Sequence, residues 1–194
     1  ANKAIQAKLD ALSTEKVENL EIGGRNLLIS SNLDRLAENF TYNTTKHLKA
    51  RINYYFNFIV ELEPNTEYVV SNKKIIHDGS GEEPENTLRL AIFNETTSAQ
   101  KQAIGRLYSG SSISFKTNSN ITQGDKLLFY PTGATQIDFE VLELKLEKGN
   151  KPTDWTPAPE DVQSDYESKI KQAADSISLA VYNKTLDALN PATE

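Results

Sequence analysis

The residues of this chain that could do chemistry are aromatic and polar side chains at outward positions of predicted strands. From Arg51 to Leu62 the apolar residues alternate, which predicts a strand with Phe56 and Phe58 on its buried face. Rings outside a core can stack on a sugar, while nearby amides and guanidinium groups bond its hydroxyls. The candidate saccharide-binding residues are Arg51, Asn53, Tyr55, Asn57, Arg89, Phe93 and Tyr130.

These candidates come from three separate predicted strands. In the strand predicted for residues 87–94, Arg89 and Phe93 point outward, and Tyr130 has the opposite parity to Leu127 and Phe129. If two of the three strands share a sheet, their outward residues form a polar and aromatic cleft that suits a glycan. The alternatives are that the residues are scattered, or that this face packs against another protomer.

Catalysis is not predicted. The chain has two histidines, His47 and His77, both in polar stretches, and we expect His77 to be a solvated loop residue. The sequence contains no G-x-S-x-G elbow, H-E-x-x-H helix or phosphate-binding loop. We therefore expect a protein that is not an enzyme.

A loop between residues 77 and 85 gathers carboxylates beside two glycines. These carboxylates are Asp78, Glu82, Glu83 and Glu85. A mobile loop suits neither the general acid nor the nucleophile of a glycosidase, so we interpret the loop as solvated and acidic. A structural calcium ion held by these oxygens is the alternative, and no other metal or cofactor is predicted.

Composition excludes several classes of protein. The 194 residues include no cysteine, so disulfides, thiol nucleophiles and thiolate metal sites are excluded. The net charge of −6, with acids and bases interspersed, disfavours a nucleic-acid-binding surface. No apolar run approaches the roughly 18 residues of a membrane helix, so membrane insertion is not expected. Methionine is absent even at position 1, which indicates a piece of a longer protein.

Seven or more short strands separated by turn signals predict an all-β fold, a jelly-roll β-sandwich. The predicted strands are residues 26–30, 51–62, 66–72, 87–94, 112–117, 126–130 and 137–147. In the last of these, Phe139 and Val141 share one face, and the alternation then shifts by one residue to Leu142 and Leu144. The shift indicates either a β-bulge near Val141 or a strand that is buried on both sides.

Helical patterns flank the predicted sandwich. Residues 3–20 carry apolar side chains at spacings of three and four, and the same spacing follows Pro159. The C-terminal apolar positions are Val162, Tyr166, Ile170, Ala173, Ile177 and Val181. Such narrow seams suit self-association in a coiled coil. The alternatives are fraying of the first segment and packing of the second against the sandwich. The predicted domains are residues 1–21, 22–158 and 159–194, namely a helical stalk segment, the sandwich and a second stalk segment.

The two ends of the predicted sandwich resemble a known module. The segment KLEKGNKPTDWTPAPED, residues 145–161, resembles the end of a β-sandwich module of tail and receptor-binding proteins from phages of Gram-positive bacteria. IGGRNLLISSN, residues 22–32, resembles the start of that module, and FIVELEPNTEYVVSN, residues 58–72, resembles strands of jelly-roll carbohydrate-binding modules. The resemblance covers roughly residues 22 to 159.

This resemblance implies a protein of the virion, at a phage tail tip or fibre. It implies non-covalent recognition of host cell-wall polysaccharide, contact with other tail proteins, and a homo-oligomer, a trimer, formed through the helical stalk. Trp155 would be a structural latch that ties the exit segment to the sandwich. A structural spacer without a ligand is the main alternative, and a hydrolase of wall polymer is a third.

Overall fold

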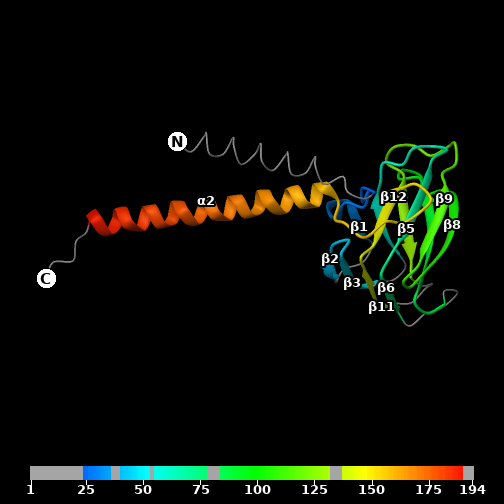
Figure 1. Cartoon of the computed structure of the whole chain (residues 1–194), viewed down its shortest axis with the longest axis horizontal. Helices are drawn as coiled ribbons and strands as arrows, with labels where there is room; N and C mark the ends of the chain where they lie inside the picture. Colours follow the sequence, from blue (N-terminus) through cyan, green and yellow to red (C-terminus); the bar gives the residue numbers. More distant parts are fainter. Residues whose placement is uncertain (1–23, 36–39, 53–54, 78–83, 132–136, 190–194) are drawn as a thin grey trace. The chain divides into compact units, whose positions relative to one another are not determined.

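The structure is a computed structural model that describes residues 24–35, 40–52, 55–77, 84–131 and 137–189. The described part contains strands, one short 3-10 helix (Ser30–Asn32) and one α-helix, α2 (Pro159–Leu189) (Figure 1). The strands are β1 (Leu33–Arg35), β2 (Phe40–Asn43), β3 (His47–Ile52), β4 (Phe56–Ile59), β5 (Glu67–Ser71), β6 (Lys74–His77), β7 (Thr87–Phe93), β8 (Gln100–Tyr108), β9 (Ser112–Lys116), β10 (Lys126–Tyr130), β11 (Ile137–Leu142) and β12 (Lys145–Lys148).

The strands form antiparallel sheets. Sheet A has the order β1-β4-β10-β7-β8, sheet B the order β2-β3-β11-β6, and sheet C the order β12-β5-β9. All three sheets contribute to one hydrophobic core, for example through Phe58 of sheet A, Leu48 of sheet B and Val70 of sheet C. The described chain is therefore a mostly-β sandwich with one C-terminal helix.

Stacked phenylalanines join sheet A to sheet B. Phe56 of β4 stacks on Phe129 of β10 with ring centroids 4.9 Å apart and on Phe139 of β11 with centroids 5.1 Å apart. Phe58 meets both Phe56 and Phe129 edge to face. All four rings are buried, so this cluster supplies much of the apolar contact between the two layers.

The single strand predicted for residues 51–62 is wrong. The chain forms two strands here, β3 in sheet B and β4 in sheet A. Both sheets bury one face against the same core, to which β3 contributes Leu48 and β4 contributes Phe56. Periodicity alone cannot distinguish this crossover from one long strand.

The run from 137 to 147 is also divided between sheets. β11 belongs to sheet B and β12 to sheet C, and Glu143 between them has a left-handed φ of 52°. The shift in alternation is therefore a change of sheet rather than a bulge within one strand. The strand predicted at residues 26–30 is not formed, although the Leu27 N–H donates to the Leu146 carbonyl at 2.7 Å. Strands β1, β2, β6 and β8 lie outside the predicted strands.

The helix α2 begins at Pro159, with Glu160 and Asp161 in its first turn, as its sequence predicts. In the described residues, no helix has the length and apolar character needed to cross a membrane. The N-terminal helix predicted for residues 3–20 lies outside the described residues. The sheets belong to one compact unit, Leu20–Pro159, and α2 to another.

Candidate functional site

The outer face of sheet A is the face turned away from the core. Side chains alternate between the two faces along each strand, and this alternation determines which residues lie on the outer face. Phe56 and Phe58 point inward from β4, so Asn57 points outward, and Leu127 and Phe129 point inward from β10, so Tyr130 points outward. In β7 the register pairs Arg89 with Tyr130. Three of the predicted strands thus contribute neighbouring residues to one surface.

Three partly exposed rings form an aromatic cluster on this face: Tyr55, Tyr130 and Phe93. Tyr130 is central, with its ring centroid 5.5 Å from that of Tyr55 and 6.2 Å from that of Phe93. Both neighbours are tilted against it, at 57° and 52°. Partly exposed rings at these separations offer apolar contact surface without being part of the core.

Arg89 adds a cation to the aromatic cluster. Its guanidinium carbon lies over the Tyr130 ring, 5.1 Å from the centroid, in a cation–π arrangement. Burial raises the pKa of the Tyr130 phenol to about 12, an effect that Arg89 opposes and Tyr55 reinforces. The Tyr130 hydroxyl is therefore neutral at physiological pH and can donate or accept a hydrogen bond.

Asn57 is a buried residue of the same face, and its side-chain oxygen has no hydrogen-bond donor among the described residues. The side chain is 3% exposed, and among the described residues no donor reaches its Oδ1 atom. A buried acceptor of this kind costs about 1–3 kcal/mol. Unsatisfied buried groups occur at functional sites, so Asn57 marks this part of the sheet as unusual.

Lys126 and Asp34 form an ion pair on the same face. The Lys126 ammonium donates to the Asp34 carboxylate at 2.9 Å, and this hydrogen bond raises the pKa of Lys126. Lys126 is the register partner of both Ile59 and Phe93, so the pair lies beside the aromatic cluster. Mixed charge next to exposed rings gives the face several groups that can bond hydroxyls.

The structure brings five of the seven predicted residues onto one sheet and places a sixth, Arg51, in another sheet. Tyr55, Asn57, Arg89, Phe93 and Tyr130 belong to sheet A or the residue just before it. Arg51 lies in β3 of sheet B, and its side chain, like the whole of Asn53, lies outside the described residues.

Sequence reasoning missed Lys126, Asp34 and Arg106 on this face. The parity of Lys126 with Tyr130 was a usable signal, because both belong to the strand predicted at 126–130. Arg106, the register partner of Arg89, is not among the candidates because no strand is predicted between residues 94 and 112.

The histidines have structural positions. The prediction that His77 is a solvated loop residue is wrong. His77 ends β6 and is 4% exposed, and its Nε2 accepts the Thr87 N–H at 3.1 Å. Burial follows from the pairing of β6 with β11, which the sequence did not reveal. His47 pairs with Glu140 across β3 and β11 at 2.6 Å.

Metal ligation has little support in the described residues. Within the described ranges, no group of three or more His, Asp or Glu side chains could hold a metal ion. Of the acidic loop, Asp78, Glu82 and Glu83 lie outside these ranges, so the structural calcium remains an untested alternative.

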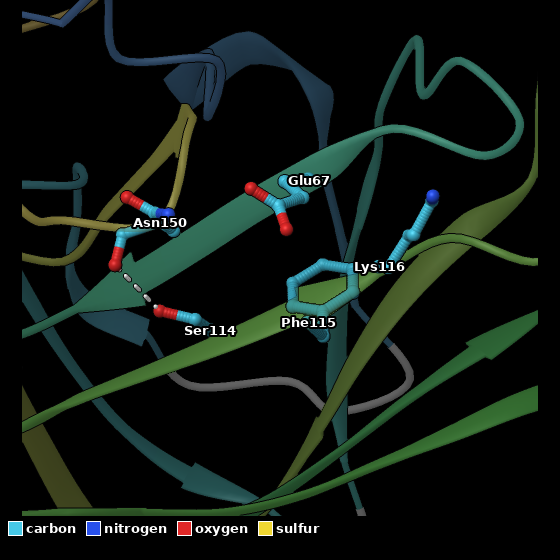
Figure 2. A pocket seen from close by; sticks show the side chains of 5 residues that line it. All are labelled: Glu67, Ser114, Phe115, Lys116 and Asn150. Carbon is cyan, nitrogen blue, oxygen red and sulfur yellow. Dashed lines mark hydrogen bonds between the residues drawn. The ribbon is translucent and has the colours of Figure 1, made fainter.

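A second surface feature is a pocket of about 230 Å³ on sheet C, shown in Figure 2. Its lining residues are Glu67, Ser114, Phe115, Lys116 and Asn150. The Ser114 hydroxyl donates to the Asn150 carbonyl at 3.0 Å, and the Phe115 ring stacks on buried Tyr68 with centroids 5.9 Å apart. The pocket is smaller than the roughly 300–1,000 Å³ typical of ligand sites. The aromatic ring that lines this pocket, Phe115, already packs on Tyr68. We therefore favour the outer face of sheet A as the binding site.

Trp155 lies near the exit of the sandwich. Its indole N–H donates to the Leu144 carbonyl at 3.2 Å, and the Lys46 ammonium lies 5.8 Å from the ring centroid. The neighbouring Thr156 carbonyl accepts a hydrogen bond from the Asn26 side chain at 3.2 Å. These contacts suit a latch, which remains a prediction.

A buried polar network lies beside Trp155. The Lys145 ammonium, 0% exposed, contacts Thr153 Oγ1 at 2.6 Å and Glu147 Oε2 at 3.3 Å. Glu147, 1% exposed, also accepts the Thr153 N–H at 2.6 Å, and the Gly24 N–H donates to Thr153 Oγ1 at 3.2 Å. A Cβ atom at Gly24 would lie 1.7 Å from Glu147 Oε2, so the carboxylate fits because residue 24 is glycine. We call Gly24, Lys145, Glu147 and Thr153 the polar clamp.

Comparisons with known proteins give distant structural likenesses. No protein-family model and no curated protein matches the sequence. A carbohydrate-binding module described as CBM4 matches with a TM-score of 0.40 and 13% identity, over 53% of this chain and 71% of its own. The N-terminal cellulose-binding domain of β-1,4-glucanase C from Cellulomonas fimi matches with a TM-score of 0.39 and 11% identity, over 58% of this chain and 84% of its own.

A phage protein is also among the similar structures. The tripod from the baseplate of bacteriophage Tuc2009 matches with a TM-score of 0.39 and 15% identity, over 70% of this chain and 59% of its own.

Proposed function

We propose that this chain is a phage tail module that recognises host cell-wall saccharide non-covalently through the outer face of sheet A. The observation that carries the proposal is the aromatic cluster, in which Tyr55 and Phe93 flank Tyr130 and Arg89 lies over its ring. Rings, a guanidinium group and a neutral phenol on one face are the groups that a sugar requires. The resemblance of residues 22–32 and 145–161 to phage tail modules supports the setting, a virion tail tip or fibre.

The test removes the two flanking rings together. The double variant Tyr55→Ala with Phe93→Ala is expected to weaken binding of the chain to purified host wall polysaccharide by about tenfold or more, because each lost ring contact is worth about 0.5–1.5 kcal/mol. Isothermal titration calorimetry measures the affinity, and circular dichroism melting verifies that the double variant is folded.

A matched control comes from another sheet. Ile76→Ala trims a side chain that is 39% exposed on β6 of sheet B, and this variant should bind as the parent does. Equal affinity of the folded double variant and the parent would contradict the proposal. Failure of the parent to bind any wall polysaccharide would favour the rival, a structural spacer of the fibre.

We further propose that residues 1–21 and 159–194 are stalk segments that assemble the chain into a homotrimer. In α2 the predicted seam includes Ile177, 64% exposed, and Val181, 59% exposed. Apolar residues at spacings of three and four on an exposed helix suit association with other helices. Several copies on one stalk would raise the avidity for a repeating polysaccharide. Contact with other tail proteins belongs to the same proposal.

A charge placed on the seam should prevent this assembly. Ile177→Glu is expected to shift the full chain from trimer to monomer in sedimentation equilibrium, since each helix would bury a carboxylate against its neighbours. Leu179→Glu is the control: Leu179 is 61% exposed but lies off the seam, so the trimer should persist. A parent chain that is monomeric at high concentration would contradict the stalk proposal.

A further inference from the structure

The pocket on sheet C differs from the sheet A face in shape, and its walls also carry groups that bond sugars. Its volume of about 230 Å³ is below that of pockets for drug-sized ligands, so its occupant must be smaller than these. A hollow of this size can enclose one sugar ring rather than a chain of sugars. The walls come from β5 (Glu67), from β9 (Ser114, Phe115 and Lys116) and from the turn after β12 (Asn150) (Figure 2).

Hydrogen bonds hold the turn that carries Asn150 in place. The Gly149 N–H donates to the Glu67 carbonyl at 2.9 Å, and the Ser114 hydroxyl donates to the Asn150 carbonyl at 3.0 Å. Gly149 has a left-handed φ of 116°, which glycine adopts without steric strain. The turn is therefore fixed to both β5 and β9. A wall that is already ordered loses little conformational freedom when a ligand binds.

Three polar side chains of the pocket are available to a ligand. Glu67 and Lys116 are register partners of opposite charge, and such pairs commonly attract each other across strands. Among the described residues, however, these two side chains form no ion pair, and the side-chain amide of Asn150 makes no hydrogen bond. All three residues are exposed, so water satisfies their side chains until a ligand replaces it.

The available groups match the chemistry of a neutral sugar. The Glu67 carboxylate only accepts hydrogen bonds, the Lys116 ammonium only donates them, and the Asn150 amide does both. A sugar hydroxyl donates and accepts, so it can bond each of these groups. A ligand with a net charge would be attracted by Glu67 or Lys116 and repelled by the other, which favours a neutral ligand.

Phe115 supplies the apolar part of the pocket. Its ring is partly exposed, and Figure 2 shows the Glu67 carboxylate turned toward it and Asn150 beside Ser114. A sugar ring has polar hydroxyls at its edge and apolar C–H groups on its faces. The carboxylate and the phenyl ring would therefore contact different parts of the same sugar.

We propose that the pocket on sheet C binds one neutral sugar residue, with Glu67 and Asn150 bonding its hydroxyls and Phe115 packing against its apolar face. A pocket for one residue accepts the end or a branch of a polysaccharide, whereas the interior of an unbranched chain does not fit. This second site goes beyond the proposed function because it does not use the aromatic cluster of sheet A.

The experiment locates sugar binding by nuclear magnetic resonance. The isotope-labelled full chain is titrated with the methyl glycosides of glucose, galactose, N-acetylglucosamine and rhamnose, and with glycine as a small zwitterion. For at least one glycoside we expect saturable shifts of the amide signals of Glu67, Phe115 and Asn150. These shifts should persist in the double variant Tyr55→Ala with Phe93→Ala, which lacks the flanking rings of the other site.

Glu67→Gln keeps the shape of the side chain and removes its charge. Affinity for the glycoside should fall about tenfold or more, as expected when hydrogen bonds to a charged group are weakened. Phe115→Leu keeps an apolar side chain without the flat ring and should weaken binding roughly two- to tenfold. Glu61→Gln is the matched control: Glu61 is an exposed carboxylate that does not line the pocket, so this variant should bind as the parent does.

The outcomes separate this site from the sheet A face. Shifts confined to sheet A, or equal affinities of Glu67→Gln and Glu61→Gln, would refute the pocket as a sugar site and leave the proposed function standing. Tighter binding of glycine than of every glycoside would make the pocket a site for zwitterions and overturn the inference. If no glycoside shifts the pocket signals, the inference also fails, while calorimetry with wall polysaccharide still tests sheet A separately.

Discussion

Replacing Phe56 by alanine is expected to lower the free energy of unfolding by about 3–5 kcal/mol. Phe56 is fully buried and stacks on Phe129 in one sheet and on Phe139 in the other, at 4.9 and 5.1 Å. Truncation removes both stacks and leaves a cavity where the layers meet, which the surrounding strands could fill only by moving closer together. Urea denaturation followed by the fluorescence of Trp155, the single tryptophan, measures the change.

Phe115 provides the comparison for this variant. Its ring is partly exposed and, within the described ranges, stacks on one other ring, that of Tyr68, so Phe115→Ala should destabilise the fold clearly less than Phe56→Ala. Phe56→Leu keeps most of the volume and should fall between the two. A loss below about 1 kcal/mol for Phe56→Ala would mean that the stack does not hold the layers together.

The second large effect is expected at the polar clamp. Glu147→Ala should destabilise the sandwich by about 3–5 kcal/mol, because it leaves the fully buried Lys145 ammonium without its carboxylate. The same substitution removes the acceptor of the Thr153 N–H and Oγ1–H, at 2.6 and 2.7 Å. Chemical denaturation of the parent and of Glu147→Ala at one pH provides the measurement.

An exposed ion pair on the next residue is the matched control. Lys148 contacts Glu63 at 2.5 Å, with the two side chains 52% and 61% exposed. Glu63→Ala should therefore destabilise the fold much less than Glu147→Ala, because solvent screens an exposed ion pair. The double variant Lys145→Met with Glu147→Leu removes both buried charges and should recover much of the stability lost in Glu147→Ala. Equal losses in Glu147→Ala and Glu63→Ala would show that burial does not set the strength of this pair.

Alternation of apolar residues in the sequence predicted correctly which side chains of β4 and β10 face the core. Phe56, Phe58, Leu127 and Phe129 all point inward as their parity requires. The same parity put Tyr55, Phe93 and Tyr130 outside the core, where the structure has them partly exposed. Side-chain direction follows from local backbone geometry, so it can be read from a short stretch of sequence.

The grouping of those outward residues could not be predicted in the same way. Tyr55 and Tyr130 meet because β4 pairs with β10, in which the register partners Phe56 and Phe129 are 73 residues apart and Asn57 and Leu128 are 71 residues apart. Arg51 does not belong to this group because the chain changes sheets between β3 and β4. Pairing and crossover depend on contacts between distant segments, and an alternating pattern is the same whichever sheet a strand joins.

The polar clamp has a mechanical consequence. Gly24 and Leu27, where the chain enters the sandwich, bond to Thr153 and Leu146, where it leaves, at 3.2 and 2.7 Å. Tension applied at these two points would pass directly from one to the other through a short bridge of hydrogen bonds and a buried ion pair. The remaining strands lie outside that load path, so pulling on the module would leave the aromatic face undistorted until the bridge ruptures.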